Sequence, residues 1–188
     1  QDHLFHLVYG LVNLPHGRMK SREGSVVDAD NLMDELSDLA YEKIAERNKD
    51  MPEEEKRIIA EQVMNAAWKF YLLKTAPNKT ITFEPEKSID FHGATGPYLQ
   101  YAGVRLKSIF RKADEFNPGN KVIISELSQE EKPLGVKILE FPQILNRAAE
   151  HKNPTYIVTY LLELAQEWSS YYAEHSVLKA ETEELKKA

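Results

Sequence analysis

The chain lacks several features, and each absence narrows the kinds of protein it can be. Its 188 residues include no cysteine, which excludes disulfides and thiolate metal sites and fits a reducing compartment such as the cytoplasm. No apolar run approaches the ~18 residues that a membrane-spanning helix needs, so we expect no membrane partner. The first residues contain neither a methionine nor a basic leader, from which we expect a piece of a longer protein.

Positive charge is also scarce, with 24 Lys and Arg against 30 Asp and Glu and a formal net charge of −6. This balance argues at first sight against a nucleic-acid-binding protein. The cations are unevenly distributed, however, since residues 98–121 contain five Lys or Arg and two Asp or Glu. A local basic patch on an acidic protein can bind RNA while limiting non-specific contacts, so this window is a candidate RNA-binding segment.

Hydrophobic periodicity and capping residues predict a mainly α fold. We expect a buried strand over residues 4–14, a short extended piece over residues 80–83, and six or seven helices in a bundle-like arrangement. The predicted helix starts are at Asp28, Pro52, Pro97, Ser128, Pro142 and Asn153. Ser128 and Glu131 have the spacing of a capping box. The charged residues 178–188 indicate a last helix.

Apolar stripes at helical spacing mark the predicted core. In the helix after Asp28 the stripe consists of Leu32, Leu36, Leu39, Ala40 and Ile44. In the helix after Pro52 it consists of Ile59, Val63, Ala66, Ala67 and Phe70. In the helix after Asn153 it consists of Ile157, Tyr160, Leu161, Leu164, Ala165 and Trp168.

Three cations lie close together in residues 17–24, a segment with glycine at both ends. These are Arg18, Lys20 and Arg22. Glycine lets a backbone approach a ligand closely, and Arg and Lys stabilise the charge that develops on a transferring phosphoryl group. The residues by themselves allow two interpretations, a phosphate-binding loop or an ordinary solvated basic loop.

A second segment combines helix-breaking residues with aromatic and basic side chains. Two glycines and a proline precede a helix that carries Tyr98, Gln100, Tyr101 and Arg105. Because Tyr98, Tyr101 and Arg105 are spaced i, i+3 and i+7, they share one helix face. Aromatic rings can stack on unpaired bases, and arginine can bind a phosphate or a base edge. The alternative is that one of these tyrosines, Tyr101 rather than Tyr98, is a core residue whose hydroxyl forms a hydrogen bond.

The order of residues in these segments resembles the arginyl-tRNA synthetases, which are class I aminoacyl-tRNA synthetases. Residues 14–27, LPHGRMKSREGSVV, are similar to the family's KMSKS loop, and residues 95–105, TGPYLQYAGVR, are similar to its TGPYLQYAHAR signature. Residues 160–172 are similar to the family's YLYELA…FxxFY helix. Gly103 and Val104 depart from the signature, and the family's H-x-G-H signature is absent.

For the loop, the resemblance implies ATP binding and a part in adenylate formation. The positions that match the family's loop, and that we therefore expect to bind the phosphates of ATP with Mg²⁺, are Arg18, Met19, Lys20, Ser21 and Arg22. Of these, Lys20 and Arg22 are the expected catalytic residues, because they supply positive charge near the pyrophosphate. We expect ATP and arginine to bind in the longer enzyme and no tightly bound cofactor in this chain.

For the remainder, the resemblance implies the family's α-helical anticodon-binding domain. The expected domains are the end of the catalytic domain over residues 1–50 and a carboxy-terminally truncated anticodon-binding domain over residues 51–188. The expected tRNA contacts are Tyr98, Gln100, Tyr101, Arg105 and Tyr172. We expect Trp168 to lie in the core, the chain to be a monomer, and His3 and His6 to bind no metal, since no third ligand is nearby.

Two other functions are compatible with the residues. A stand-alone tRNA- or RNA-binding module without catalysis would need residues 98–121 but not the basic loop of residues 17–24. A helical protein-interaction domain would tolerate loss of Tyr98 and Arg105 without any effect on RNA binding. The presence of both segments favours part of an arginine–tRNA ligase.

Overall fold

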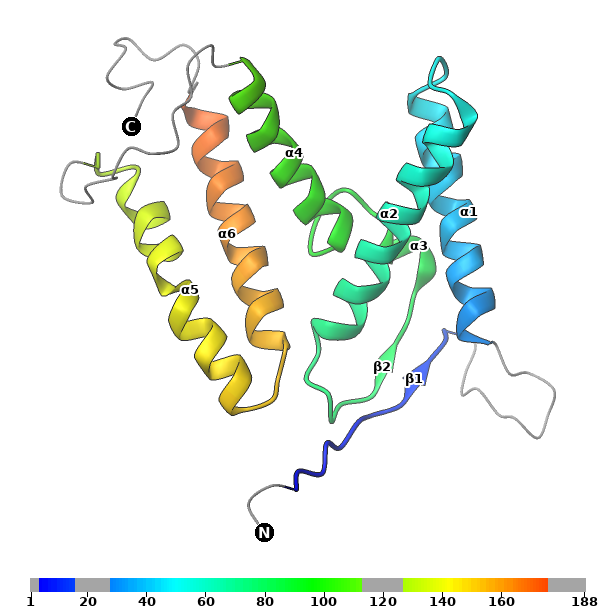
Figure 1. Cartoon of the computed structure of the whole chain (residues 1–188), viewed down its shortest axis with the longest axis horizontal. Coiled ribbons are helices and arrows are strands. Elements are labelled where there is room, and N and C mark those ends of the chain that lie inside the picture. Colours follow the sequence, from blue (N-terminus) through cyan, green and yellow to red (C-terminus); the bar gives the residue numbers. More distant parts are fainter. Residues whose placement is uncertain (1–3, 16–27, 113–126, 176–188) are drawn as a thin grey trace. The chain divides into compact units, whose positions relative to one another are not determined.

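The structure is a computed structural model that describes residues 4–15, 28–112 and 127–175 (Figure 1). These residues form six helices and two short strands. The chain divides into two compact units, which are residues 1–100 with 153–155, and residues 101–152 with 156–188. No helix among the described residues is long and apolar enough to cross a membrane.

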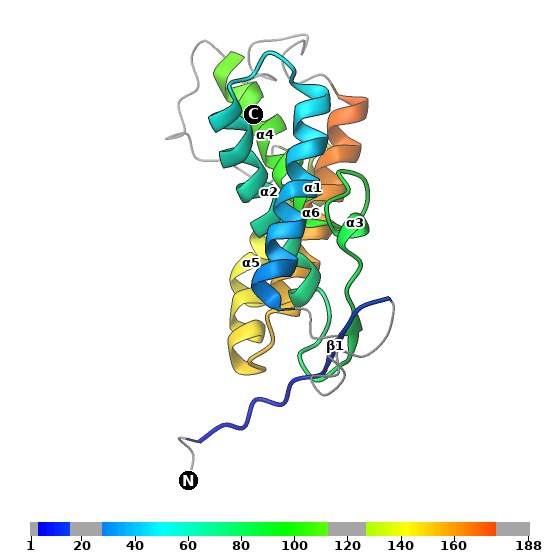
Figure 2. The ribbon, with the colours of Figure 1, turned by 90° about the vertical axis from the view of Figure 1, so that its right-hand side faces the viewer.

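The first unit is built around a helical hairpin. Helices α1 (Ala29–Arg47) and α2 (Glu53–Leu73) lie side by side in both views (Figures 1 and 2). The Asp28 carboxylate accepts a hydrogen bond from the Asp30 N–H at 3.4 Å, and three glutamates occupy the first turn of α2. Both features stabilise the positive end of a helix, and both predicted helix starts are confirmed to within a residue.

The predicted strand over residues 4–14 is wrong for most of its length. Strand β1 (Val12–Asn13) is paired in parallel with β2 (Ile81–Thr82). The Ile81 N–H donates to the Leu11 carbonyl, and the Phe83 N–H donates to the Asn13 carbonyl. A strand requires a partner backbone, and β2 is too short to pair with more than the end of the predicted strand.

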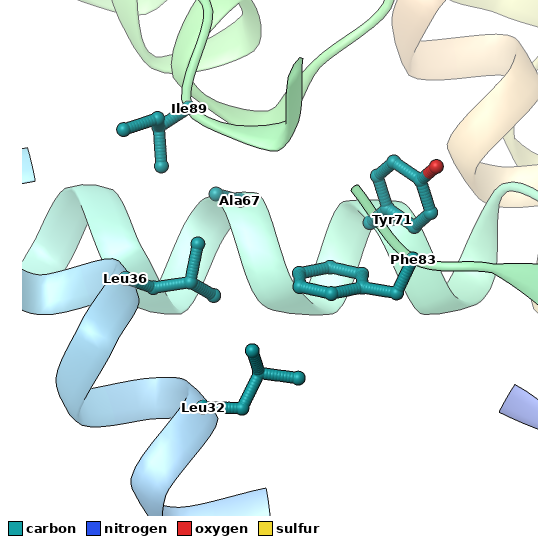
Figure 3. Close-up of a cluster of buried hydrophobic side chains, with 6 residues drawn as sticks. All are labelled: Leu32, Leu36, Ala67, Tyr71, Phe83 and Ile89. Carbon is teal, nitrogen blue, oxygen red and sulfur yellow. The ribbon is translucent and has the colours of Figure 1, made fainter. Parts of the chain in front are cut away.

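The core of this unit lies between the hairpin and the segment that follows β2. Figure 3 shows six buried side chains, which are Leu32, Leu36, Ala67, Tyr71, Phe83 and Ile89. Phe83 makes edge contacts with Tyr71 at 4.7 Å and Trp68 at 5.1 Å between ring centroids. A second buried cluster consists of Ala40, Ile44, Ala60 and Val63. The stripes predicted on α1 and α2 therefore supply part of the core, and Tyr71, Phe83 and Ile89, which were not predicted, complete the first cluster.

The second unit contains most of α4 (Gly96–Lys112), with α5 (Lys132–Glu150) and α6 (Thr155–Glu174). Within it α6 lies between α4 and α5 (Figure 1). Helices α5 and α6 are antiparallel, and the stacked rings of Phe141 and Tyr160 join them with centroids 5.4 Å apart. Tyr160 and Trp168 are buried on α6 as predicted, whereas Leu161, at the edge of the stripe, is 38% exposed.

Proline and the capping residues have different effects on α5. The Ser128 and Glu131 side chains each accept a hydrogen bond from the other's backbone N–H, as in the predicted capping box, but α5 begins at Lys132, three residues later than that box predicts. The helix start predicted at Pro142 is wrong, because α5 continues through this residue. Proline removes one helical N–H, and the carbonyl that loses its donor belongs to Ile138, a residue on the exposed side of α5.

The boundary expected between residues 50 and 51 falls in the loop between α1 and α2. Both helices belong to the first compact unit, and they pack on each other. Compact units are defined by contacts and domains by function, so the assignment of residues 51–188 to anticodon binding stays a prediction.

Candidate nucleic-acid interface

A hydrogen-bonded turn fixes the start of α4. The Asp90 carboxylate accepts from the His92 N–H at 3.0 Å. The Thr95 hydroxyl donates to the Asp90 carbonyl and accepts from the Tyr98 N–H at 3.2 Å. Thr95 is buried, and it satisfies one of the backbone N–H groups that a helix leaves unpaired at its start.

The glycines of this motif serve packing and backbone geometry. Gly93 has a φ of +92°, a conformation that side-chain-bearing residues rarely adopt. A Cβ on Gly96 would lie 2.1 Å from the Ala66 carbonyl oxygen, so α4 begins in direct contact with the backbone of α2. At Gly103, by contrast, a Cβ would have no atom within 4 Å. The first two glycines therefore position the helix, and Gly103 does not.

Arg105 lies against two tyrosine rings from different helices of the second unit. Its Cζ is 4.8 Å from the ring centroid of Tyr101 on α4 and 5.2 Å from that of Tyr172 on α6. Both distances are within the range of a cation–π interaction. Among the described residues Arg105 has no salt bridge, and its N–H groups donate no hydrogen bond. The rings thus hold a cation whose donors are available to a ligand.

The sequence around this cluster contains an additional signal that a count of cations misses. Residues 91–113 include no Asp or Glu, although the chain has 30 of them. The same helix carries Lys107, Arg111 and Lys112, all exposed. Within α4 itself no carboxylate offsets this positive charge, which favours an anionic partner.

The carboxyl-terminal end of α6 is anchored by aromatic and acidic side chains. The Tyr172 ring packs on Trp168 with centroids 5.5 Å apart, and Trp168 is buried as expected. The Tyr171 hydroxyl donates to Glu131 at 3.2 Å, and burial followed by the charge of Glu131 raises the pKa of Tyr171. Tyr171 was not predicted as part of the site, although the capping box marks Glu131 as a fixed acceptor. These contacts hold Tyr172 beside Arg105.

The other predicted tRNA contacts lie apart from this cluster. The Gln100 amide nitrogen donates to the Gln62 carbonyl at 3.1 Å, so this side chain links α4 to α2. Tyr98 is half-buried. The alternative that Tyr101 is a core residue is wrong, because Tyr101 is 47% exposed and its ring lies against Arg105. The RNA-binding roles of Tyr98 and Gln100 stay predictions.

The predicted phosphate loop cannot be placed in the same way. Its residues, Arg18, Met19, Lys20, Ser21 and Arg22, lie outside the described residues. Among residues 4–15, 28–112 and 127–175, no group of three His, Asp or Glu could hold a metal ion.

Comparison with known proteins identifies both parts of the chain. The family of tRNA synthetases class I (R), catalytic domain, matches residues 1–84, and the DALR anticodon binding domain matches residues 99–188. An arginine–tRNA ligase of Treponema denticola is 41% identical over 98% of this chain. The chain belongs to the arginyl-tRNA synthetase family. The resemblance seen in the two sequence motifs is therefore confirmed.

Other members of the arginyl-tRNA synthetase family agree in sequence and in fold. The arginine–tRNA ligase of Porphyromonas gingivalis is 40% identical over 97% of this chain. The structure of the Thermus thermophilus arginyl-tRNA synthetase superposes with a TM-score of 0.84 at 34% identity, over 97% of this chain and 30% of that one. The mainly α fold is thus the one expected of the family. The chain spans about a third of the length of these curated relatives, 32% in each case.

Proposed function

We propose that this chain is part of an arginine–tRNA ligase, the enzyme that uses ATP to attach arginine to its tRNA. The relatives bear this name, and the chain is similar to one continuous third of them. In this enzyme the described residues bind tRNA, mainly at the anticodon arm. The observation that carries this role is the cluster of Tyr101, Arg105 and Tyr172, within the segment that matches the anticodon binding domain.

The geometry of the cluster suits an unpaired nucleotide. A guanidinium packed against two rings has fewer accessible rotamers, so it loses less conformational freedom when it binds. Its N–H edge can donate two parallel hydrogen bonds to a phosphate or to a base. The exposed Tyr101 ring offers a face on which a base can stack, which contributes about 1–3 kcal/mol per base.

The basic loop would serve the chemical step in the longer enzyme. We assign Arg18, Met19, Lys20, Ser21 and Arg22 to the phosphates of ATP, which would bind as its Mg²⁺ complex, on the strength of the family motif. Lys20 and Arg22 stabilise the pyrophosphate as arginyl-adenylate forms. Arginine and ATP are thus partners of the whole enzyme, in the cytoplasm. This chain alone is expected to be an inactive monomer, and ATP–pyrophosphate exchange by the purified chain would contradict that inactivity.

Titration of the chain with tRNA tests the proposal. We expect tighter binding to arginine-accepting tRNA than to the same tRNA altered at the central anticodon base, measured at one fixed salt concentration. The reason is that a stacked and hydrogen-bonded base contributes affinity that a phosphate contact does not. Equal affinity for both tRNAs would contradict an anticodon-binding role for these residues.

A further inference from the structure

In the second compact unit, a second arginine packs against a tyrosine ring. Like Arg105, it forms no salt bridge among the described residues. The Cζ of Arg147 on α5 is 4.9 Å from the ring centroid of Tyr156 on α6. Arg147 is exposed, and among the described residues it forms no salt bridge. It therefore resembles Arg105 in its chemistry, but it lies at the other end of α6. Tyr156 and Tyr172 are sixteen positions apart in this helix, which is about 24 Å along its axis.

Other basic side chains gather at the same turn. The His151 ring is 5.7 Å from the Tyr156 ring between centroids, so Tyr156 contacts both His151 and Arg147. Lys152 follows, exposed and with a φ of +49°. Glu150 is the single Asp or Glu within residues 141–162. The turn between α5 and α6 therefore carries more positive than negative charge in an acidic protein.

Part of this charge has a local explanation, because cations at the end of α5 stabilise its negative pole. A third arginine provides a comparison, because it packs on a tyrosine that is hydrogen-bonded to a carboxylate. The Cζ of Arg57 is 4.8 Å from the ring centroid of Tyr41, whose hydroxyl donates to Glu53. Hydrogen bonds from Lys56 and Tyr41, and then the charges of Lys56 and Arg57, lower the pKa of Glu53. The charge of Arg57 thus acts on a nearby carboxylate, that of Glu53, whereas among the described residues Arg147 forms no salt bridge.

We propose that Arg147 and His151, held against Tyr156, form a second RNA contact that binds the phosphate backbone. The inference rests on the proposed function for its ligand, an RNA. Tyr156 is half-buried and lies against Arg147 and His151, so its ring is not a platform for a base. The turn offers the exposed side chains of Arg147 and Lys152, whose positive charge suits phosphate recognition. Binding here is therefore independent of sequence.

The test measures the affinity of the chain for two RNAs over a range of salt concentrations. One is arginine-accepting tRNA and the other is an RNA duplex of unrelated sequence. We expect Arg147→Gln to weaken binding to both by about three- to tenfold and to reduce the salt slope by about one, as loss of one phosphate contact does. Arg147→Lys should retain most of the slope, because it keeps the charge. Arg57→Gln is the matched control, and it should change neither quantity.

The outcomes separate this inference from the proposed function. If Arg147→Gln leaves affinity and salt slope unchanged for both RNAs, the second contact does not exist, while a preference for the unaltered anticodon still supports the proposed function. If Arg147→Gln weakens binding but the chain does not distinguish the anticodons, the contact stands and the proposed function is contradicted. Absence of binding to either RNA contradicts both. A loss that depends on the anticodon would contradict phosphate recognition.

Discussion

Single glycines in α4 differ in whether a side chain can be added. Gly96 packs its backbone on Ala66, whereas Gly103 faces open space. We expect Gly96→Ala to lower the free energy of unfolding by about 2 kcal/mol or more, since the backbone of α2 cannot yield easily. Gly103→Ala should raise it by up to about 1 kcal/mol, because alanine is the better helix former. Urea denaturation of both variants measures this, and changes of the same sign would contradict the packing described.

Tyr71 links the core of the first unit to β2 through its hydroxyl. The hydroxyl donates to the Thr82 carbonyl at 2.7 Å, and burial raises the pKa of Tyr71. We expect Tyr71→Phe to lower the free energy of unfolding at pH 7 by about 1 kcal/mol, because the Thr82 carbonyl loses its donor.

The pH dependence of the free energy of unfolding provides a second measure of the contribution of Tyr71. A pKa raised in the folded state means that the stabilisation is complete below the unfolded value of 10.0 and is lost as pH rises through the folded value. Burial is also the largest cause of the raised pKa values of Tyr160 and Tyr171. The unaltered chain should therefore lose stability above pH 10, and Tyr71→Phe should lose less. An identical alkaline loss in both proteins would rule out this contribution of Tyr71.

Residue roles could be predicted from the sequence only where they depend on residue type. Arginine and tyrosine are suited to RNA, and this placed Tyr101 and Arg105 among the candidates, whereas the resemblance to the family added Tyr172. Which tyrosine would be exposed could not be predicted, because exposure depends on how the helices pack and not on residue type; Tyr101 is exposed and its ring lies against Arg105. The same limit applies to Gln100, whose partner Gln62 lies on another helix.

At the scale of elements, the capping box of α5 supports the end of α6. Glu131 accepts from the Ser128 N–H through one carboxylate oxygen and from the Tyr171 hydroxyl through the other. Loss of the box should therefore weaken both the start of α5 and the attachment of Tyr171, the neighbour of Tyr172.

We expect Ser128→Ala to lower the free energy of unfolding by about 1 kcal/mol, a value typical of a lost cap. Gln129→Ala, at an exposed position between the two capping residues, is the control and should change it by less than about 0.5 kcal/mol. Thermal or urea unfolding followed by circular dichroism gives both values. Equal effects of the two substitutions would show that the cap does not contribute.

Most helices could be predicted because their signals are local. Asp28, the glutamates after Pro52 and the box at Ser128 each act within one turn of their helix. The strand over residues 4–14 could not be predicted correctly, because a strand depends on the backbone beside it, and β2 is two residues long. The helix start predicted at Pro142 was wrong for a related reason. The local sequence does not show that the residues on both sides of Pro142 form one long helix, α5.

At the scale of the whole molecule, the order of motifs along the chain was sufficient to predict the family. Such an order is a property of sequence alone, and the matches to residues 1–84 and 99–188 agree with it. What sequence could not provide is the meeting of Arg105 with Tyr172, which are far apart in the chain and belong to different helices. Because Arg105 contacts both rings, Tyr101, Arg105 and Tyr172 form one candidate site.

The measurement that tests the central claim most directly is a double-mutant cycle between Arg105 and the anticodon. Affinities would be measured for the unaltered chain and for Arg105→Gln, each with arginine-accepting tRNA and with the tRNA altered at its central anticodon base. If the cluster binds the anticodon arm, Arg105→Gln weakens binding about tenfold or more to the unaltered tRNA and much less to the altered one. Equal losses for both tRNAs, or none, would contradict anticodon recognition by Tyr101, Arg105 and Tyr172.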